Sequence, residues 1–294
     1  MDNFIVDNNR YIIGKNHKKE DVSNFVIHEV VKKIIFEIDR ICRKNDIPYA
    51  LAFGSALGLY NYGGFIPWDD DGDIVIDYFD YERLVNALKN DLSEEFCFDS
   101  EATNPLYNPL IPAFKVRYKN SYIKEKNHFT LPDHSTNHGI FVDICLFMGV
   151  PKNKKEHLKL INYSKRKMPL YIFLDAFLHI NPKKIRKKLR EFEKDTATKY
   201  RDSGYVSQTV IIPFQEYPKK FVESLSFPKE VIYPFKEYDF YGRKIYSFND
   251  IKEFSRLRYG EKALKIVTES GEIKDPFLKK NKKSGHIKVI DIYD

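Results

Sequence analysis

Cysteine is scarce in this chain of 294 residues, which holds only three, at positions 42, 97 and 145. An odd and scattered set provides neither a disulfide framework nor the paired CxxC spacing of a zinc site. Apolar runs of about 18 residues are also missing, and the N-terminus lacks the apolar core of a signal peptide. These absences argue against a disulfide-stabilised secreted domain and an integral membrane protein, and they predict a soluble, cytoplasmic protein.

Apolar and aromatic residues, by contrast, are plentiful, at 43% and 15% of the chain. This content is sufficient for a large packed core and argues against disorder. Helical and strand-like patterns are interspersed, which predicts an α+β fold built on a mixed sheet. The predicted elements are helices at 20–44, 56–60 and 81–90, strands at 49–53, 73–77 and 139–147, a hairpin formed by 113–118 and 121–126, and basic helices within 152–201.

Four aspartates lie within five positions of the stretch GGFIPWDDDGDIVI, residues 63–76. Side chains of an extended segment alternate between its faces, so Asp69, Asp71 and Asp73 are expected to point one way and Asp70 the other. Three carboxylates on one face repel each other unless a cation lies among them. Hard oxygen ligands select Mg²⁺ or Mn²⁺, so the stretch predicts a divalent metal site. The alternative is an acidic turn whose charges are solvated.

A single carboxylate also interrupts the apolar strand GIFVDICLF, residues 139–147. An aspartate buried in such a strand needs a partner, and a metal ion would be one. Asp143 is therefore predicted to supply a further carboxylate from a neighbouring strand.

Two pairs of residues are candidates for binding phosphate. Gly54 and Ser55 follow a buried strand where a helix is expected to begin, with Ser55 as its cap, so backbone N–H groups there could approach a phosphate closely. Lys115 and Arg117 alternate on one face of the strand AFKVRY. They could bind phosphate, or they could belong to a solvated strand face.

Three stretches of the sequence resemble the motifs of a known family. The stretch FGSALGLYNYGGFIPWDDDGDIVI resembles the signature of the LicD family, which includes fukutin-related proteins and belongs to the nucleotidyltransferase superfamily, with the fold of DNA polymerase beta. NHGIFVDICLF resembles the second motif of the family, and residues 240–245 with 257–260 resemble its C-terminal motif. The chain departs from the pattern at Asn61 and Tyr62, where Arg and His are common, and at Gly72, where an aliphatic residue is usual.

The resemblance implies transfer of a substituted phosphate, such as phosphocholine or a polyol phosphate, from a CDP-linked donor to a hydroxyl of a cell-surface glycan. Such glycans include lipopolysaccharide, capsule and teichoic acid. Asp71 and Asp73 would hold Mg²⁺ or Mn²⁺, with Asp69 as an auxiliary ligand; Asp69 with Asp71 is the alternative pair. Asp143 would complete the metal site or accept the proton of the attacking hydroxyl. The remaining candidates for binding the donor are Gly54, Ser55, Lys115, Arg117 and Trp68.

The expected organisation has three parts: a nucleotidyltransferase-like catalytic core at 1–150, a basic helical segment at 151–203, and a C-terminal part at 204–294 that completes the active site. Two other functions remain open. One is a nucleotidyltransferase that places a nucleoside monophosphate on an acceptor, and the other is a non-catalytic module that binds a membrane or a nucleic acid.

Positive charge is concentrated in one segment. The chain has a net charge of +7, but residues 152–194 hold 14 Lys+Arg and 4 Asp+Glu, which is +10, so the rest sums to −3. These residues could form solvated helix faces. They could also bind anionic headgroups beside the apolar residues 168–180, in keeping with a lipid-linked acceptor at the inner membrane face. Nucleic-acid binding is disfavoured, because aromatic residues do not interleave with the basic ones.

Overall fold

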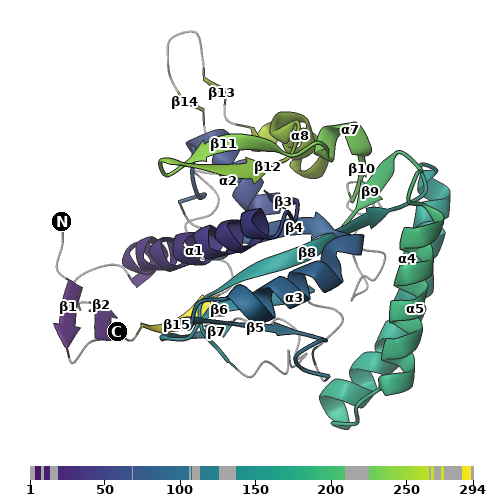
Figure 1. Ribbon diagram of the computed structural model, residues 1–294, viewed down its shortest axis with the longest axis horizontal. Coiled ribbons are helices and arrows are strands. Elements are labelled where there is room, and N and C mark those ends of the chain that lie inside the picture. Colours follow the sequence, from purple (N-terminus) through teal and green to yellow (C-terminus); the bar gives the residue numbers. More distant parts are fainter. Residues whose placement is uncertain are drawn as a thin grey trace.

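The computed structural model of the protein describes residues 4–7, 10–13, 19–67, 69–105, 107, 113–125, 137–208, 225–264, 266–267, 273–274 and 287–292 (Figure 1). The helices are α1 (Lys19–Lys44), α2 (Phe53–Tyr62), η1 (Tyr78–Asp80), α3 (Tyr81–Asp91), α4 (Lys154–Ile172), η2 (Phe173–Phe177), α5 (Lys183–Lys199), α7 (Lys229–Ile232), α8 (Ile251–Tyr259) and η3 (Glu261–Ala263). The strands are β1 (Phe4–Asp7), β2 (Arg10–Ile13), β3 (Tyr49–Leu51), β4 (Asp73–Asp77), β5 (Phe96–Ser100), β6 (Phe114–Tyr118), β7 (Ser121–Glu125), β8 (Phe141–Gly149), β9 (Tyr205–Ser207), β10 (Ser226–Pro228), β11 (Lys236–Phe240), β12 (Arg243–Ser247), β13 (Ile266–Val267), β14 (Ile273–Lys274) and β15 (Ile287–Ile292).

A nine-stranded mixed sheet forms the centre of the fold, with the strand order β10-β9-β8-β4-β3-β12-β11. Strands β4 and β8 run parallel, as do β3 and β12, while β3 and β4 are antiparallel. Strand β8 is long enough for β6 to pair with its first half and β9 with its end, and β5 extends the sheet beyond β6. The expected mixed sheet with helices is confirmed, and the two aspartate-bearing strands lie at its centre.

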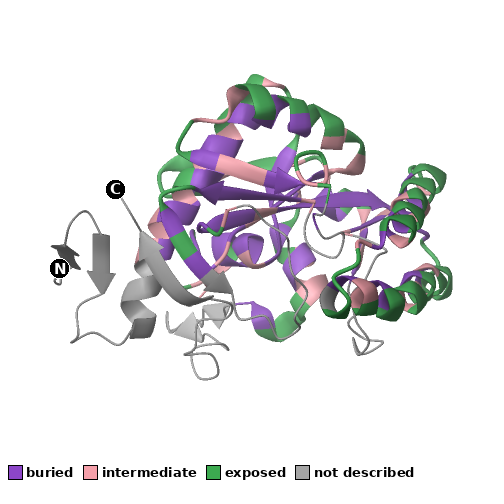
Figure 2. Ribbon diagram, turned by 90° about the horizontal axis from the view of Figure 1, so that it is seen from below, coloured by how far each residue is buried: buried purple, intermediate pink, exposed green. Residues whose placement is uncertain are grey.

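Helix α1 contributes a large part of the core. Its apolar residues recur with helical spacing, and Ile34, Ile38 and Ile41 are fully buried. The helix contacts β6, β8 and α3 (Figure 1). Because β4 and β8 are covered in this way, their runs of Ile, Val, Leu and Phe are buried, as Figure 2 shows by colour.

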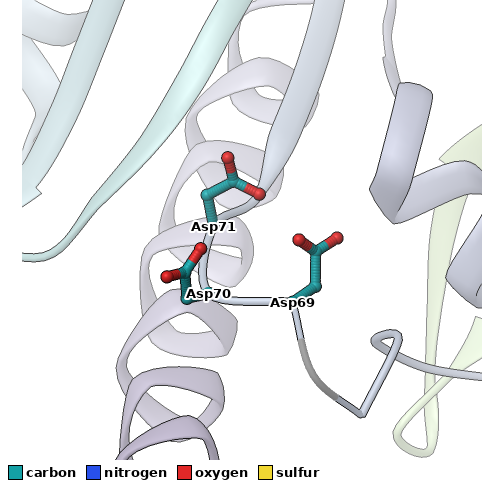
Figure 3. A group of neighbouring side chains, drawn as sticks. All are labelled: Asp69, Asp70 and Asp71. Atoms are coloured by element: carbon teal, nitrogen blue, oxygen red, sulfur yellow. The ribbon is translucent and has the colours of Figure 1, made fainter. Parts of the chain in front are cut away.

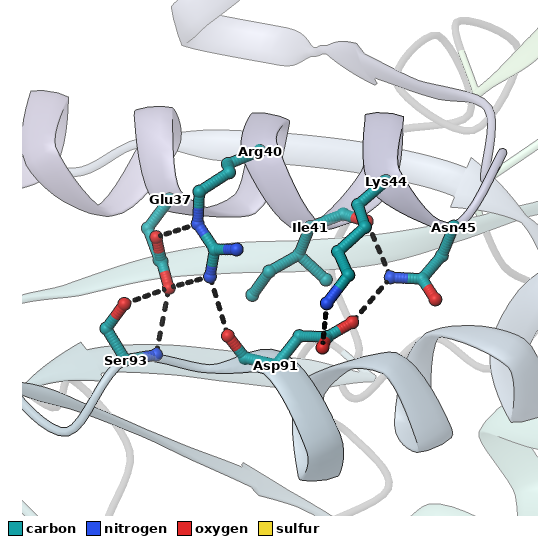
Figure 4. Close-up of polar contacts among 7 residues, drawn as sticks. All are labelled: Glu37, Arg40, Ile41, Lys44, Asn45, Asp91 and Ser93. Carbon is teal, nitrogen blue, oxygen red and sulfur yellow. Dashed lines mark hydrogen bonds and ion pairs between the residues drawn. The ribbon is translucent and has the colours of Figure 1, made fainter.

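Polar side chains fix the C-terminal half of α1 to α3 and to the residues before β5 (Figure 4). The Glu37 carboxylate accepts hydrogen bonds from Arg40 Nε at 2.8 Å and from the Ser93 hydroxyl at 2.7 Å. Arg40 also donates to the Asp91 carbonyl at 2.6 Å, and Lys44 Nζ lies 2.6 Å from the Asp91 carboxylate. These bonds, led by the one from Arg40, lower the pKa of Glu37 to about 2. The network fixes the C-terminal half of α1 in place, and earlier turns of the same helix contact the loop that carries the aspartates.

Helices α4 and α5 form an antiparallel helical hairpin at one side of the molecule (Figure 1). Asn153 caps α4 by accepting bonds from the N–H groups of Lys155 and Glu156. Figure 2 shows that much of the outward surface of this hairpin is exposed. Within the described residues, no helix is both long and apolar enough to cross a membrane.

Three predictions of local structure need correction. The strand predicted at 49–53 ends at Leu51, and the following helix begins at Phe53 rather than Ala56, so Ser55 lies inside its first turn and is not its cap. Phe53 turns the chain with a positive φ of 44°, and its ring packs against Phe147 and Phe254 at 6.0 and 6.3 Å between ring centroids. This aromatic packing stabilises the unusual turn.

The predicted hairpin of 113–118 with 121–126 is wrong in its pairing, although both strands exist. Strand β6 is occupied on its two edges by β5 and β8, so β7 pairs instead with the distant β15. The extended conformation expected across the aspartates is found only from Asp73 onward, because strand β4 begins there and residues 69–72 precede it without regular secondary structure; they are called here the acidic loop.

Candidate metal and phosphate site

Two aspartates lie side by side on the two central parallel strands, Asp73 as the first residue of β4 and Asp143 as the third residue of β8. Asp73 of β4 is in register with Asp143 of β8, and the Asp143 N–H donates to the Gly72 carbonyl at 2.8 Å. Paired residues on neighbouring strands present their side chains on the same face of a sheet. Burial raises the pKa of Asp73, and the negative charges of Asp71, Asp143 and Asp69 raise it further. The structure therefore brings these four carboxylates together.

The acidic loop carries three neighbouring carboxylates, Asp69, Asp70 and Asp71 (Figure 3). One oxygen from each of Asp69, Asp70 and Asp71 lies within 4.8 Å of the other two. Asp70 is nearly inaccessible, with 1% of its surface exposed, whereas Asp69 and Asp71 are partly exposed. Asp70 was expected to point away from Asp69 and Asp71, and this is only partly the case. Its side chain is buried more deeply than theirs, but one of its carboxylate oxygens still lies close to them.

His28 of α1 holds the acidic loop in place. Its Nε2 lies 2.7 Å from the Asp69 carbonyl oxygen, and its ring stacks on Phe65 at 4.7 Å. Burial lowers the pKa of His28, while the Asp69 carbonyl and the charge of Asp70 act in the opposite direction. His28 was not predictable as a site residue from the sequence, because nothing in the helical pattern distinguishes it from other polar positions on α1.

The first turn of α2 lies directly against the aspartates. A Cβ atom at Gly54 would lie 2.7 Å from Asp69 Oδ2 and 3.9 Å from Asp73 Oδ2, so glycine at this position allows the Asp69 carboxylate to lie close against the backbone. Ser55 Oγ accepts a hydrogen bond from the Asp73 N–H at 2.9 Å. The first helical bond of α2 runs from the Ala56 N–H to the Ala52 carbonyl, and the N–H groups of a first turn have no partner within their own helix. The predicted phosphate-binding position and the predicted metal site are thus adjacent.

Lys115 belongs to the same site, in contact with Asp143. The two residues are paired between β6 and β8, and Lys115 Nζ lies 3.2 Å from Asp143 Oδ1. The exposed fractions of the two side chains are 4% and 15%, so the pair is largely shielded from water. The Lys115 ammonium also lies over the Phe141 ring, 3.2 Å from its centroid.

Arg117 shares that strand face but is turned to a different set of partners. Its guanidinium donates to the Gly139 carbonyl at 3.0 Å and lies 3.4 Å from the Asp99 carboxylate, with 1% of its side chain exposed. The structure therefore places Lys115 beside Asp143 and Arg117 in the interior. Both residues are buried, which excludes the alternative of a solvated strand face. The remaining candidate, Trp68, lies outside the described residues.

The C-terminal part of the chain also reaches the site. Helix α8 packs against α2 and ends at Arg258 and Tyr259. The Arg258 guanidinium lies 5.9 Å from the Phe53 ring centroid, next to the first turn of α2. Tyr259 is 38% exposed as a whole, but burial around its hydroxyl raises the pKa of that group, and the charges of Asp73 and Asp69 contribute to the increase. The resemblance at 257–260 marked these two residues, but no role followed from sequence alone.

The donor set fits a hard divalent cation. Asp69, Asp71, Asp73 and Asp143 offer only carboxylate oxygens, which Mg²⁺ and Mn²⁺ prefer. Burial raises the pKa of Asp73, and the charges of Asp71, Asp143 and Asp69 raise it further, while Lys115 acts in the opposite direction. A bound cation would relieve the repulsion among these groups.

Comparison with known proteins matches the same region. Residues 46–170 match the family model described as LicD/FKTN/FKRP, nucleotidyltransferase domain. The lipopolysaccharide cholinephosphotransferase LicD of Haemophilus influenzae is similar, with 27% identity over 115 residues, which is 39% of this chain. The chain aligns with 40% of the length of that relative. The matched range contains α2, the acidic loop, Lys115 and Asp143, so the residues of the site lie within the region that resembles the LicD/FKTN/FKRP nucleotidyltransferase domain.

Proposed function

We propose that the protein is a metal-dependent phosphotransferase that moves a substituted phosphate from a CDP-linked donor to a hydroxyl of a cell-surface glycan. The observation that carries this proposal is the convergence of four carboxylates with the first turn of α2 and Lys115. A site with clustered oxygen ligands beside free helix N–H groups suits a metal-bound diphosphate. The similarity to a lipopolysaccharide cholinephosphotransferase supports the same class of reaction.

In this proposal, Asp71 and Asp73 hold Mg²⁺ or Mn²⁺, together with Asp69 and Asp143. The cation would neutralise negative charge that develops on the departing nucleotide. Gly54 lets the backbone of the first α2 turn approach a phosphate oxygen, and the N–H groups of that turn donate to it. Ser55 fixes the start of β4 through the Asp73 N–H, so the phosphate-binding turn and the metal ligands keep their relative positions.

Asp143 is the group best placed to receive the proton of the attacking hydroxyl. Lys115 Nζ lies 3.2 Å from Asp143 Oδ1, and an ionised carboxylate is needed both to bind the metal and to accept a proton. The position of Asp143 beside Lys115 is compatible with the two roles predicted from the sequence, which are to complete the metal site and to accept the proton of the attacking hydroxyl.

We propose the polymerase-beta-like arrangement for the core at 1–150, with 151–203 as a helical insertion and 204–294 as the part that completes the site. The contact between α8 and α2 supports the last assignment. We place the reaction on the cytoplasmic side of the membrane, with the glycan acceptor carried on a lipid.

The test is incubation with a panel of CDP-linked donors and Mg²⁺, with and without EDTA, measuring CMP release and the mass of the glycan product. The proposal predicts metal-dependent CMP release and an acceptor heavier by the small phospho-group. An acceptor heavier by a nucleotide would show nucleotidyl transfer instead, the activity that the name of the family model favours.

The matched control variant is Asp77→Asn, at the opposite end of β4. Asp73→Asn should abolish CMP release, whereas Asp77→Asn should preserve it, because its amide oxygen can still accept the Phe79 N–H bond that Asp77 accepts at 2.9 Å. Equal activity in Asp73→Asn and the unmodified protein would contradict the proposal.

A further inference from the structure

The end of the α4–α5 hairpin exposes a group of large apolar side chains. We call residues 170–182, which join the two helices, the hairpin tip. The exposed fractions of its apolar side chains range from 48% to 66%, in Leu170, Phe173, Phe177, Leu178 and Ile180. The hairpin lies along one side of the sheet, so the tip is at an end of the molecule and not between packed layers (Figure 1).

These side chains are not needed for the packing of the hairpin itself. The hairpin has its own small core, in which Met168 and Leu189 are buried and Ile172 and Ile185 pack against them. Arg186, below the tip, donates to the Pro105 carbonyl and to the Tyr171 hydroxyl. Because the inner side is filled and hydrogen-bonded, the outward apolar residues are free to contact something else.

The backbone holds two of the exposed rings together. Residues 173–177 form a single π-helical turn that closes with the Leu178 N–H donating to the Phe173 carbonyl at 3.2 Å. Pro169 lies one turn earlier in α4 and lacks a backbone N–H, which favours such an irregular turn. Phe173 and Phe177 stack with 6.3 Å between their centroids, so they form one continuous apolar surface.

Exposed cations surround this surface on both helices. Arg166 and Lys167 precede it on α4, and the exposed lysines that follow it on α5 are Lys183, Lys184, Lys187 and Lys188. The only acidic residue between positions 157 and 190 is Asp175, and its side chain is buried. Two copies of the tip would therefore repel each other, whereas a negatively charged surface would attract it.

We propose that the hairpin tip binds the surface of a membrane that contains anionic lipids. The apolar side chains enter the boundary between headgroups and acyl chains, and the lysines and Arg166 contact lipid phosphates. A combination of aromatic and aliphatic side chains with flanking basic residues is suited to this interface. The inference rests on the exposed surface of the hairpin and not on the carboxylate site, so it does not depend on the proposed reaction.

The experiment is sedimentation of the full chain with vesicles of phosphatidylcholine alone, and with vesicles of phosphatidylcholine and phosphatidylglycerol mixed in equal parts. Binding should require phosphatidylglycerol and weaken as salt is raised. Combined Phe173→Ser and Phe177→Ser substitutions should lower the partition coefficient by about tenfold or more, because two exposed rings no longer insert. Combined Lys183→Glu and Lys184→Glu substitutions should reduce binding to the anionic vesicles specifically.

Matched controls make the same chemical changes elsewhere. Lys154→Glu with Lys155→Glu changes two exposed lysines at the start of α4, about 25 Å from the tip at 1.5 Å per residue. Phe79→Ser removes an exposed ring on η1. Both controls should bind vesicles as the unmodified protein does, and all variants should keep its thermal unfolding midpoint.

Equal binding to both vesicle types, or unchanged binding of the tip variants, would overturn the inference. A dimer in solution that the phenylalanine substitutions convert to a monomer, without vesicle binding, would identify a second copy as the occupant and would also overturn it. Asp73→Asn should bind vesicles normally, which separates this result from any failure of the proposed reaction.

Discussion

Substitution of Lys115 by methionine is the most informative perturbation of the site, because it removes one charge from a largely shielded pair. Lys115 Nζ and Asp143 Oδ1 are 3.2 Å apart, and little of either side chain is exposed. Methionine keeps a flexible apolar side chain of similar length over the Phe141 ring. The change therefore leaves the Asp143 carboxylate beside Asp73 with less positive charge nearby.

The size of the effect follows from the distance. Two unit charges 3.2 Å apart interact by about 5 kcal/mol at an effective dielectric constant of about 20. Water reaches part of the Asp143 side chain, which is 15% exposed, so we expect a loss of about 3 kcal/mol in the free energy of unfolding, at the lower end for broken buried pairs. For a chain of this size that corresponds to a fall of about 6 °C in Tm.

The assay is urea unfolding in EDTA and again with Mg²⁺, on a double-mutant cycle with Asp143→Asn. In EDTA, Lys115→Met should cost about 3 kcal/mol in the presence of Asp143 and under about 1 kcal/mol in its absence. Added Mg²⁺ should recover more than half of the loss, because a cation among the carboxylates replaces the missing charge. Lys155→Met, at an exposed position, is the control.

Either of two results would refute this reasoning. The first is a coupling energy near zero between Lys115 and Asp143. The second is Lys115→Met stability that is the same with and without Mg²⁺.

Three further predictions concern single residues. Gly54→Ala should weaken Mg²⁺ binding by about tenfold or more in calorimetry, because the added methyl would lie 2.7 Å from Asp69 Oδ2; unchanged affinity would show that the space is not used. Glu37→Gln should lower the free energy of unfolding by about 2 kcal/mol at neutral pH. Since Arg40 lowers the pKa of Glu37 from 4.5 to about 2, that difference should be complete above pH 4.5 and vanish as the pH falls toward 2. Burial lowers the pKa of His157 from 6.5 to about 4, so the unmodified protein should lose free energy of unfolding as the pH falls from 6.5 to 4. His157→Phe should not show this loss, and a difference between the two proteins that stays constant over this range would contradict the assignment.

Local sequence patterns were sufficient to predict the elements that carry the aspartates. The helical recurrence of isoleucine predicted α1, and the apolar runs next to Asp73 and Asp143 predicted β4 and β8. Both strands are buried at the centre of the sheet, where long apolar runs are expected. A carboxylate in each of these buried apolar strands was therefore a usable signal for the site.

Contacts between distant segments were not predictable in the same way. Lys115 reaches Asp143 only because β6 pairs with β8, whereas the sequence suggested a local hairpin with β7. The role of Ser55 depends on where α2 begins, and that is set by the positive φ of Phe53 and the aromatic rings around it. Arg258 and Tyr259 meet the site through packing of α8 on α2, which no pattern within α8 encodes.

The central claim is that the clustered aspartates bind a divalent cation that a donor diphosphate shares. The most direct test is titration of Mn²⁺ followed by electron paramagnetic resonance, with and without CDP, on the unmodified protein and on Asp73→Asn and Asp77→Asn. The account predicts that CDP tightens Mn²⁺ binding in the unmodified protein and in Asp77→Asn, and that Asp73→Asn loses both effects. Equal Mn²⁺ binding by Asp73→Asn, or CDP binding that is unaffected by EDTA, would contradict it.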